Sequence, residues 1–409
     1  MRKHRLGATL LAVSLSLGLF GCGGSDSSTT TTPATTNAET TTAEATEAST
    51  TAPEAVDNKY FVTEENVRLL GRTFYDDATN VRWLTYSASG VEFEVTGVSL
   101  DIVLYGDSGA ANSTTDNAAR YAVYVDGERV VDEQMTVGAK TVNVFSGDEQ
   151  RTATVRLVKL SEVASSLLGV KSIQVGKGTI TPTADSNYYV EFVGDSITCA
   201  YGVDDEDRNS HFKTSTEDAT KSYAYKTCEL LNADYSLVSI SGYGIVSGYT
   251  GSKGVKSEKQ LMPLFYENLG YCPHSGGAYM SADVAWNFER QPDVIVVNLG
   301  TNDNSYTGSD AELIEEYRLG YIDFLGQIRA KNPDAHIICA LGLMGDQLYD
   351  AVESAVASYS EASGDTNVSA YHFDPITADE GYAADWHPTE ATHTRAANLL
   401  AEEIGKYLN

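Results

Sequence analysis

Three short motifs place side chains suited to acyl transfer beside the expected strands and helices. Ser196 ends a Gly-Asp-Ser motif behind an apolar run, Asn302 lies in Gly-Thr-Asn-Asp behind another, and His387 lies in Asp-Trp-His-Pro before a final helical pattern. A serine hydroxyl is a weak nucleophile unless a base accepts its proton, and histidine has a suitable pKa. An asparagine amide can donate to the oxyanion that forms on an attacked carbonyl. These residues therefore predict a serine acyl-transfer site.

Each motif also has a structural interpretation that involves no chemistry. Gly-Asp-Ser occurs again at Ser108, in a β-rich region where it fits a turn. Turn residues surround Asn302 as well, and a lone histidine is more often packed or exposed than catalytic. Ser196 differs from Ser108 because it starts a strand, loop and helix pattern. We expect Asp195 and Asp303 to hold their loops by accepting backbone hydrogen bonds.

Residues 183–409 alternate apolar strands with helical patterns. Strands are expected at 188–193, 235–240, 293–299 and 336–340, and helices at 223–231, 310–330, 347–363 and 390–408. This alternation predicts an α/β fold, in which helices cover both faces of a parallel sheet. In such folds the site lies at the carboxyl ends of the strands, which is where Ser196 and Asn302 fall.

Residues 59–182 show a different pattern, made of short segments with a period of two. Val91 to Val95 places three apolar side chains on one face and two carboxylates on the other, as in a half-buried strand. The Asp126-Gly127 pair between two such segments predicts a tight hairpin turn. The region has no convincing long helix, so we expect an all-β, jelly-roll-like sandwich domain ahead of the α/β domain.

The first 58 residues predict export and a flexible tether. A basic start precedes an apolar run from Leu6 to Phe20, and this run ends at Gly21-Cys22, which resembles the bacterial lipoprotein box. An ordinary signal peptide or a membrane-spanning anchor is the alternative, although the run is shorter than the roughly 20 residues a spanning helix needs. We expect residues 1–22 to be a signal with lipidation at Cys22. Residues 23–58, rich in Thr, Ala, Ser and Glu, then form a disordered tether on an extracytoplasmic, membrane-anchored lipoprotein.

The net charge and the cysteine content restrict the classes of partner and metal site that the chain could have. The formal net charge of −29 makes nucleic acid and anionic lipid poor partners. Besides Cys22 there are four cysteines, none in a close-spaced pair, so no zinc site is predicted. Buried free thiols are favoured over a disulfide, which the sequence leaves open. No oligomeric state is predicted.

Gly-Asp-Ser, Gly-Thr-Asn-Asp and Asp-Trp-His-Pro occur in this order on an α/β pattern, and together they resemble the SGNH (GDSL-type) hydrolase superfamily. From about residue 58 onward the chain is similar to carbohydrate esterase family two, in which a β-sandwich precedes a flavodoxin-like SGNH domain. Residues 67–73, 193–202 and 291–303 carry this narrower resemblance. It implies deacetylation of a plant polysaccharide, such as acetylated xylan or glucomannan, without any metal or organic cofactor. It also implies Ser196 as nucleophile, with oxyanion donors from Ser196, Gly242 and Asn302.

One position departs from the superfamily pattern. The acid that orients the base usually stands three residues before the histidine, where this chain has Ala384, and Asp385 comes one place later. Either Asp385 orients His387, or a backbone carbonyl does so in a Ser-His dyad. Some members of the resembled family use a carbonyl, which favours the dyad.

Two tryptophans are candidates for sugar contacts, because aromatic faces suit the apolar faces of sugar rings. Trp386 adjoins His387, and Trp286 lies in a Gly- and Tyr-rich insertion between Gly244 and Gln291. Most rings in such an insertion simply pack, which is the alternative here. Two rival functions remain: a GDSL-type lipid esterase or acyltransferase, and a non-catalytic glycan-binding lipoprotein.

Overall fold

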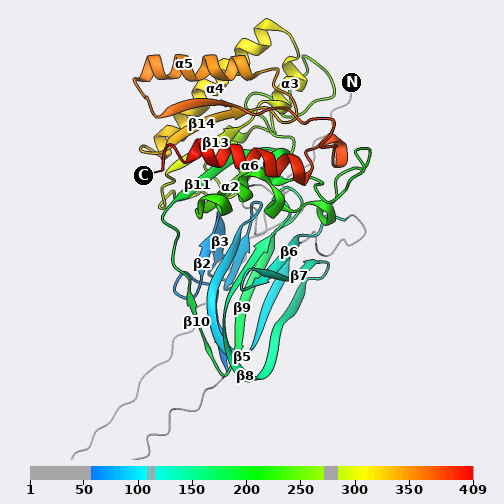
Figure 1. The fold of residues 1–409 in the computed structure, drawn as a ribbon, viewed down its shortest axis with the longest axis vertical. Helices are drawn as coiled ribbons and strands as arrows, with labels where there is room; N and C mark the ends of the chain where they lie inside the picture. Colours follow the sequence, from blue (N-terminus) through cyan, green and yellow to red (C-terminus); the bar gives the residue numbers. More distant parts are fainter. Residues whose placement is uncertain (1–56, 108–109, 111–115, 271–283, 409) are drawn as a thin grey trace, which may run out of the picture. The chain divides into compact units, whose positions relative to one another are not determined.

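Two β-sheets organise the part of the chain that the computed structural model describes, which is residues 57–107, 110, 116–270 and 284–408 (Figure 1). The expected signal, the Cys22 lipidation site and nearly all of the expected tether lie outside these residues. Within them, no helix is both long enough and apolar enough to cross a membrane.

The first sheet has ten strands, in the order β3-β4-β9-β5-β8-β6-β7, with β1 on β9 and with β2 and β10 on β5. Their bounds are β1 Asn58–Tyr60, β2 Arg68–Leu70, β3 Thr73–Asp76, β4 Val81–Leu84, β5 Gly90–Gly106, β6 Arg120–Val125, β7 Glu128–Gln134, β8 Ala139–Lys159, β9 Leu168–Gly176 and β10 Thr179–Pro182. All pairings in this sheet are antiparallel.

The long strand β5 explains how one hydrogen-bonded sheet encloses a core. It pairs with β2 and β10 before a bulge near Gly97 and with β9 after that bulge. A bulge bends a strand and increases its twist, so the two ends of β5 point in different directions and pair with different strands. The predicted hairpin is confirmed, since Asp126 and Gly127 join β6 to β7 with φ of 52° and 85°. Positive φ at both turn residues is typical of a type I′ turn.

The second sheet is entirely parallel and has the order β12-β11-β13-β14-β15. The strands are β11 Tyr189–Gly194, β12 Asp234–Ser239, β13 Val294–Asn298, β14 His336–Leu341 and β15 Val368–His372. The helices are α1 Ser196–Cys199, α2 Tyr223–Leu231, α3 Thr301–Thr307, α4 Ala311–Lys331, α5 Tyr349–Ser363 and α6 Glu390–Ile404. This is the 2-1-3-4-5 strand order of flavodoxin-like folds, so the expected α/β fold is confirmed.

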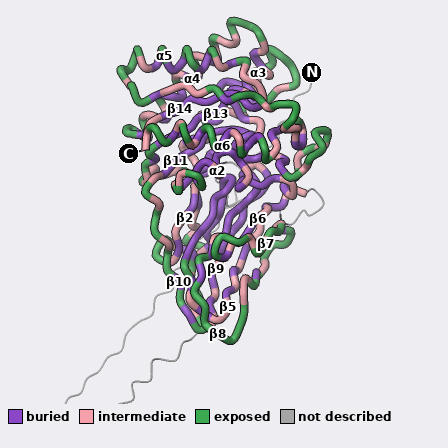
Figure 2. Tube along the Cα trace, viewed as in Figure 1, coloured by how far each residue is buried: buried purple, intermediate pink, exposed green. Residues whose placement is uncertain are grey.

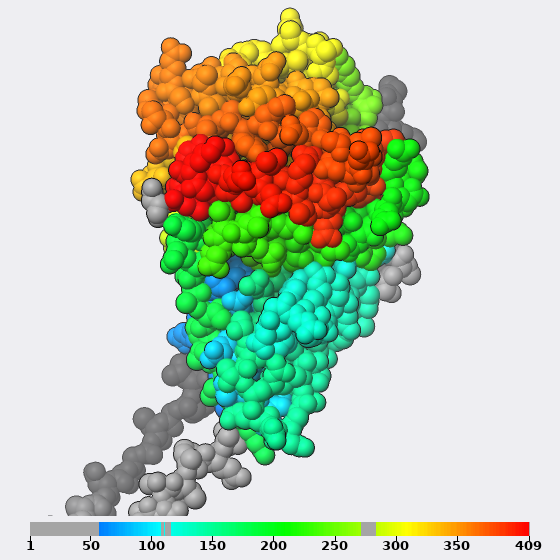
Figure 3. Space-filling model, in the orientation of Figure 1, coloured from blue at the N-terminus to red at the C-terminus, as the bar shows by residue number. Residues whose placement is uncertain are grey.

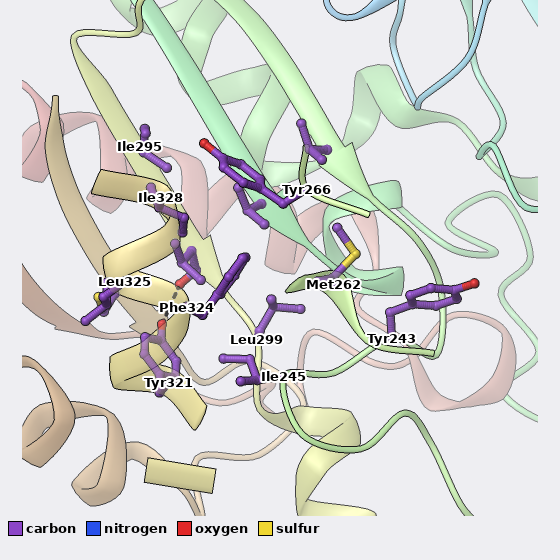
Figure 4. Close-up of a cluster of buried hydrophobic side chains, with 14 of the residues drawn as sticks. Tyr243, Ile245, Met262, Tyr266, Ile295, Leu299, Tyr321, Phe324, Leu325 and Ile328 are labelled. Atoms are coloured by element: carbon purple, nitrogen blue, oxygen red, sulfur yellow. Dashed lines mark hydrogen bonds between the residues drawn. The ribbon is translucent and has the colours of Figure 1, made fainter. Parts of the chain in front are cut away.

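Alternate residues of the central strand bury against opposite helix layers. Val294 and Val296 of β13 pack in a cluster with α2 and α6, whereas Ile295 and Val297 pack with α4 and α5. Figure 4 shows part of the second cluster, where Ile295 faces the α4 side chains of Phe324 and Ile328. A strand buried on both faces is mostly apolar, which is why β13 is an apolar run from Val294 to Val297.

The two sheets share a buried junction, and buried positions continue through both of them (Figure 2). Arg72, directly before β3, is fully buried and forms an ion pair with Glu191 of β11 at 3.0 Å. On the face seen in Figure 3, the β6–β7 hairpin adjoins residues 200–230. There Arg120 and Arg129 pair with Asp204 and Asp218 at 2.6 and 2.7 Å.

Candidate active site

Ser196 occupies the first turn of α1, immediately past the carboxyl end of β11. Asp195 caps this helix, and its carboxylate accepts from the Ile197 N–H at 3.0 Å. A Cβ on Gly194 would come 2.0 Å from the Thr198 hydroxyl, so the turn between strand and helix has room only for glycine. The sharp turn presents the Ser196 hydroxyl at the edge of the sheet.

The structure brings Ser196 and His387 together. The Ser196 Oγ lies 2.8 Å from His387 Nε2, and both residues are about nine-tenths buried. The other ring nitrogen, Nδ1, lies 3.1 Å from the backbone carbonyl of Ala384. When Nδ1–H donates to that carbonyl, Nε2 is free to accept the serine proton. The pair therefore has the geometry of an activated nucleophile.

Asp385 does not orient His387 in this structure. Its carboxylate accepts from the Tyr201 hydroxyl at 2.6 Å and faces His211 Nδ1 at 2.9 Å. Asp385 and Trp386 both adopt left-handed backbone conformations, with φ of 48° and 65°. This unusual pair of residues turns the chain so that the carbonyl at position 384, rather than the carboxylate at 385, faces the imidazole. The geometry thus matches the carbonyl alternative.

Tyr201 is a neighbour of His387 that the sequence interpretation missed. Its ring stacks on the imidazole with centroids 4.0 Å apart and planes 19° apart, while its hydroxyl is held by Asp385. The stacking fixes the plane of the imidazole, and Asp385 holds the stacked Tyr201 ring in place through its hydroxyl. The one signal available was the position of Tyr201 within the stretch 193–202 that carries the family resemblance.

Asn302 lies in the first turn of α3, past the carboxyl end of β13, and reaches the same site. Its side-chain amide donates to the Asp195 carboxylate at 3.0 Å and to the Tyr243 carbonyl at 2.8 Å. These two bonds tie together the segments that follow β11, β12 and β13. In this arrangement both amide protons already have acceptors, so a bound oxyanion would share one of them.

The loop that follows β12 is held in place by a buried carboxylate. Asp303 accepts from the backbone N–H groups of Ile245, Val246 and Ser247, at distances between 2.8 and 3.1 Å. Gly242, in the same loop, has φ of 81°. The expectation that Asp195 and Asp303 hold loops through backbone hydrogen bonds is therefore confirmed.

Burial shifts the pKa values of the acids and bases in this site. Loss of solvation lowers the pKa of His387 to about 4, so the imidazole is neutral at physiological pH. Burial raises the pKa of Asp195 to about 7 and that of Asp303 to about 6, and the charge of Asp303 contributes to the first of these shifts. A neutral imidazole hydrogen-bonded to a serine is the state that general-base catalysis requires.

Of the two suspected tryptophans, only Trp386 lies beside the Ser196–His387 pair. Its side chain is 49% exposed, the Arg208 guanidinium lies 4.3 Å from its ring, and the Tyr382 ring lies 5.1 Å away. Trp286 instead lines a cleft with Tyr189 and Asp234, at the amino ends of β11 and β12. Because all strands of this sheet are parallel, β13 must begin at the same amino-end edge. Trp286 lies shortly before β13 and is therefore at that edge, away from the carboxyl edge where Ser196 lies.

Three buried side chains outside the Ser196–His387 pair lie close enough together to contact a single cation. One oxygen each of Glu162 and Glu217 and the sulfur of Cys199 lie within 4.8 Å of one another. Of the cysteines that the structure describes, Cys199, Cys228 and Cys339 are buried and free, as expected.

Two known families match the chain. The GDSL-like Lipase/Acylhydrolase family matches residues 192–395, and the Carbohydrate esterase 2 N-terminal family matches residues 69–183. The first match contains Ser196, Asn302 and His387. The second contains nine of the ten strands of the antiparallel sheet at least in part.

Relatives and solved structures agree with these matches. The chain is 29% identical over 315 residues to the cellulase/esterase CelE of Acetivibrio thermocellus, covering 75% of this chain but only 36% of that protein. It is 28% identical over 265 residues to an acetylxylan esterase/glucomannan deacetylase of Cellvibrio japonicus, covering 61% of this chain and 68% of that protein. The structure of the acetyl xylan esterase Est2A of Butyrivibrio proteoclasticus is similar, with a TM-score of 0.76 and 25% identity over 86% of this chain and 98% of Est2A. A family two carbohydrate esterase from Clostridium thermocellum, solved with cellohexaose, gives a TM-score of 0.71 and 27% identity over 83% of this chain and 98% of that one.

Proposed function

Because the chain belongs to the GDSL-like lipase/acylhydrolase family and carries the N-terminal domain of family two carbohydrate esterases, we propose that it removes acetyl groups from an O-acetylated polysaccharide. The observation that carries this proposal is the 2.8 Å contact between the Ser196 hydroxyl and a neutral, carbonyl-held His387. The acetylxylan esterase and glucomannan deacetylase activities of the relatives favour acetylated xylan or glucomannan as substrate.

The reaction proceeds through an acyl-enzyme. Ser196 Oγ attacks the acetyl carbonyl while His387 Nε2 accepts its proton, and the Ala384 carbonyl stabilises the imidazolium through Nδ1–H. The tetrahedral intermediate collapses as His387 gives the proton to the departing sugar hydroxyl. Water then attacks the acetyl-serine with the same base, which releases acetate and restores Ser196. None of these steps requires a metal or an organic cofactor.

The oxyanion would be held by the backbone N–H groups of Ser196 and Gly242 and by the amide of Asn302. We expect Asn302→Ala to lower kcat by about 10²- to 10³-fold, the usual cost of losing one such donor. Because Asn302 also ties Asp195 to the Tyr243 carbonyl, the thermal midpoint should be recorded for the same variant. Asn304→Ala is a matched control, since Asn304 lies in the same helix and its side chain, among the described residues, donates to Gln347 at the surface. A kcat within threefold of the parent would remove Asn302 from the oxyanion site.

Trp386 is the proposed contact for a sugar ring. It is half-exposed beside the base and is braced by Arg208 and Tyr382, so its ring offers a fixed apolar face. A loss of activity on polysaccharide, but not on a small aryl acetate, is the expected signature of Trp386→Ala.

A substrate panel tests the proposal directly. Acetate release is measured from acetylated xylan, acetylated glucomannan, an aryl acetate and an aryl palmitate. The control is the same protein after reaction with a serine-directed phosphonate. Acetate from either polysaccharide that stops after phosphonate treatment supports the esterase. Preference for the palmitate favours a lipid esterase, and glycan binding without any ester hydrolysis favours a non-catalytic lipoprotein.

The pH dependence should reveal the desolvated base. His387 accepts a proton only when neutral, so its own protonation is expected to lower kcat/KM only as the pH passes through about 4, below the pKa values of Asp195 and Asp303. The measurement is a pH–rate profile on an aryl acetate, with circular dichroism at each pH to verify folding. Asp195→Asn serves as control, because burial raises the pKa of Asp195 to about 7. An acid limb near 7 that vanishes in this variant would assign the limb to Asp195 instead.

We also propose that the chain is exported and anchored outside the cytoplasm by lipid on Cys22, on the strength of the basic start, the apolar run and the Gly-Cys junction. Metabolic labelling with a fatty acid in the native host tests this, with Cys22→Ser as control. Labelling that persists in this variant would exclude Cys22 as the attachment point.

A further inference from the structure

A carboxyl group from the antiparallel-sheet part reaches the loop that carries the proposed oxyanion donor. Glu162 lies between β8 and β9 and is 3% exposed. Its Oε2 accepts a hydrogen bond from the Ser241 N–H at 2.7 Å and a longer one from the Cys199 thiol at 3.8 Å. Ser241 directly precedes Gly242, so Glu162 holds the Ile240–Ser241 peptide, which is one peptide before the one whose N–H is the proposed donor at 242.

A second buried carboxyl adjoins the first. Glu217 Oε2 accepts from the Glu162 backbone N–H at 2.7 Å, and its Oε1 has no hydrogen-bond partner among the described residues. Glu217 is fully buried, and one oxygen of each carboxyl lies within 4.8 Å of the other. Two carboxylates this close, away from water, repel each other strongly.

The charges of Lys159, Glu162 and Glu217 balance if one of the two carboxyl groups carries a proton. The fully buried Lys159 donates to the Glu162 carbonyl at 2.9 Å and supplies one positive charge beside two carboxyls. Burial and the charge of Glu162 raise the pKa of Glu217 well above its usual range, and burial also raises the pKa of Glu162. One ammonium, one carboxylate and one neutral acid leave the cluster uncharged.

A divalent cation bound by Glu162, Glu217 and Cys199 would be the other way to compensate the negative charge of the two carboxylates. Two observations favour the proton. Lys159 already places an ammonium against the Glu162 backbone, and Glu162 Oε2 is already engaged with Ser241 and Cys199. Burial also raises the pKa of the Cys199 thiol, which keeps it protonated and a poor ligand.

We propose that Glu162 is a positioning residue for the oxyanion loop, residues 241–244, and that a proton on Glu217 keeps it in place. The inference rests on the proposed function, because it matters for catalysis only if Gly242 donates to the oxyanion. It assigns the antiparallel-sheet part a role in the reaction itself. The acid that shapes the donor comes from that part, while the nucleophile and the base come from the α/β part.

Kinetic variants test the positioning role. Glu162→Ala is expected to lower kcat on an aryl acetate by about 10²-fold with little change in KM, because a displaced donor weakens binding of the transition state more than binding of the substrate. Glu162→Gln keeps an oxygen that can accept from Ser241 and should restore most of kcat. Glu92→Ala is the matched control. It removes another buried carboxylate of the same sheet, paired with Arg68 and Arg156, and should affect stability but not kcat.

The alkaline limb of the pH profile tests the proton. Loss of the Glu217 proton at high pH would set two carboxylates against each other and lower kcat, whereas Glu217→Gln has no proton to lose and should lack that fall. The other titratable or charged groups around the pair are Lys159, Arg120, Cys199, Asp195 and Tyr201. These groups remain in Glu217→Gln, so a fall of kcat at alkaline pH that is caused by any of them would persist in this variant.

The outcomes separate the two proposals. If the parent hydrolyses no ester, the proposed function fails, whatever the variants do. If the parent is active and Glu162→Ala keeps its kcat, the positioning role is overturned. A parent without an alkaline fall up to pH 10, an unchanged limb in Glu217→Gln, or a stoichiometric metal in the purified protein would each overturn the proton on Glu217.

Discussion

Ser196→Ala and His387→Ala are each expected to lower kcat for acetate release by about 10⁴-fold or more, and the double variant should fall no further. The two side chains form one proton-transfer unit across a 2.8 Å contact, so losing either one removes the activated nucleophile. Activity is measured on an aryl acetate and on acetylated xylan. A His387→Ala variant that retains more than a tenth of the parent activity would contradict the assignment of the base.

Asp385→Asn provides the informative comparison. In enzymes whose carboxylate orients the histidine, amidation of that acid costs about 10⁴-fold. Here the imidazole Nδ1 faces the Ala384 carbonyl, and Asp385 bonds Tyr201 and His211 instead. The asparagine oxygen can still accept from Tyr201, so we expect less than a tenfold loss. A loss of about 10⁴-fold would restore Asp385 as the orienting acid.

The second large effect concerns stability. Arg72→Met is expected to lower the free energy of unfolding by about 3–5 kcal/mol, because it leaves a buried carboxylate at Glu191 without its cation. Arg72 is fully buried, donates twice to Glu191 at 3.0 Å and also donates to the backbone carbonyl of Tyr266. The Tyr266 hydroxyl donates to the same carboxylate at 3.0 Å but carries no charge to replace the arginine.

Urea unfolding followed by tryptophan fluorescence measures this effect. Arg318→Met is the control, since its pair with Glu315 is exposed, and such pairs contribute about 0–1 kcal/mol. Replacing both members of the buried pair, with Arg72→Met and Glu191→Gln, should recover part of the loss because no buried charge is then left unpaired. A single-variant loss below 1 kcal/mol would show that water or another cation reaches Glu191.

Four of the five parallel strands were predictable from sequence because they are buried on both faces and read as largely apolar runs. The fifth, the edge strand β15, is only partly buried, has no such run and was not predicted. Those runs located the carboxyl edge of the sheet, and with it Ser196 and Asn302. The helix from Thr301 was not expected, since Gly-Thr-Asn-Asp favours a turn as readily as a helix start.

The remaining site residues depend on contacts between segments far apart in the chain. Glu162 lies 79 positions from Ser241, and Tyr201 lies 184 positions from Asp385, so spacing along the chain gives no signal for either contact. Trp286 shows the converse error. A position near the site was expected for Trp286 because it lies in an aromatic insertion. Trp286 instead lies at the opposite end of the sheet, because the chain must return to the amino edge to start β13.

The charged junction between the two sheets limits how this protein can be rebuilt. Arg72, Arg120 and Arg129 on one side pair with Glu191, Asp204 and Asp218 on the other. A chimera that takes its β-rich part from a related protein would have to keep both members of each pair, or bury a lone carboxylate at Glu191. For domain shuffling, the antiparallel sheet is therefore not an interchangeable module, and the smallest transferable unit spans both sheets.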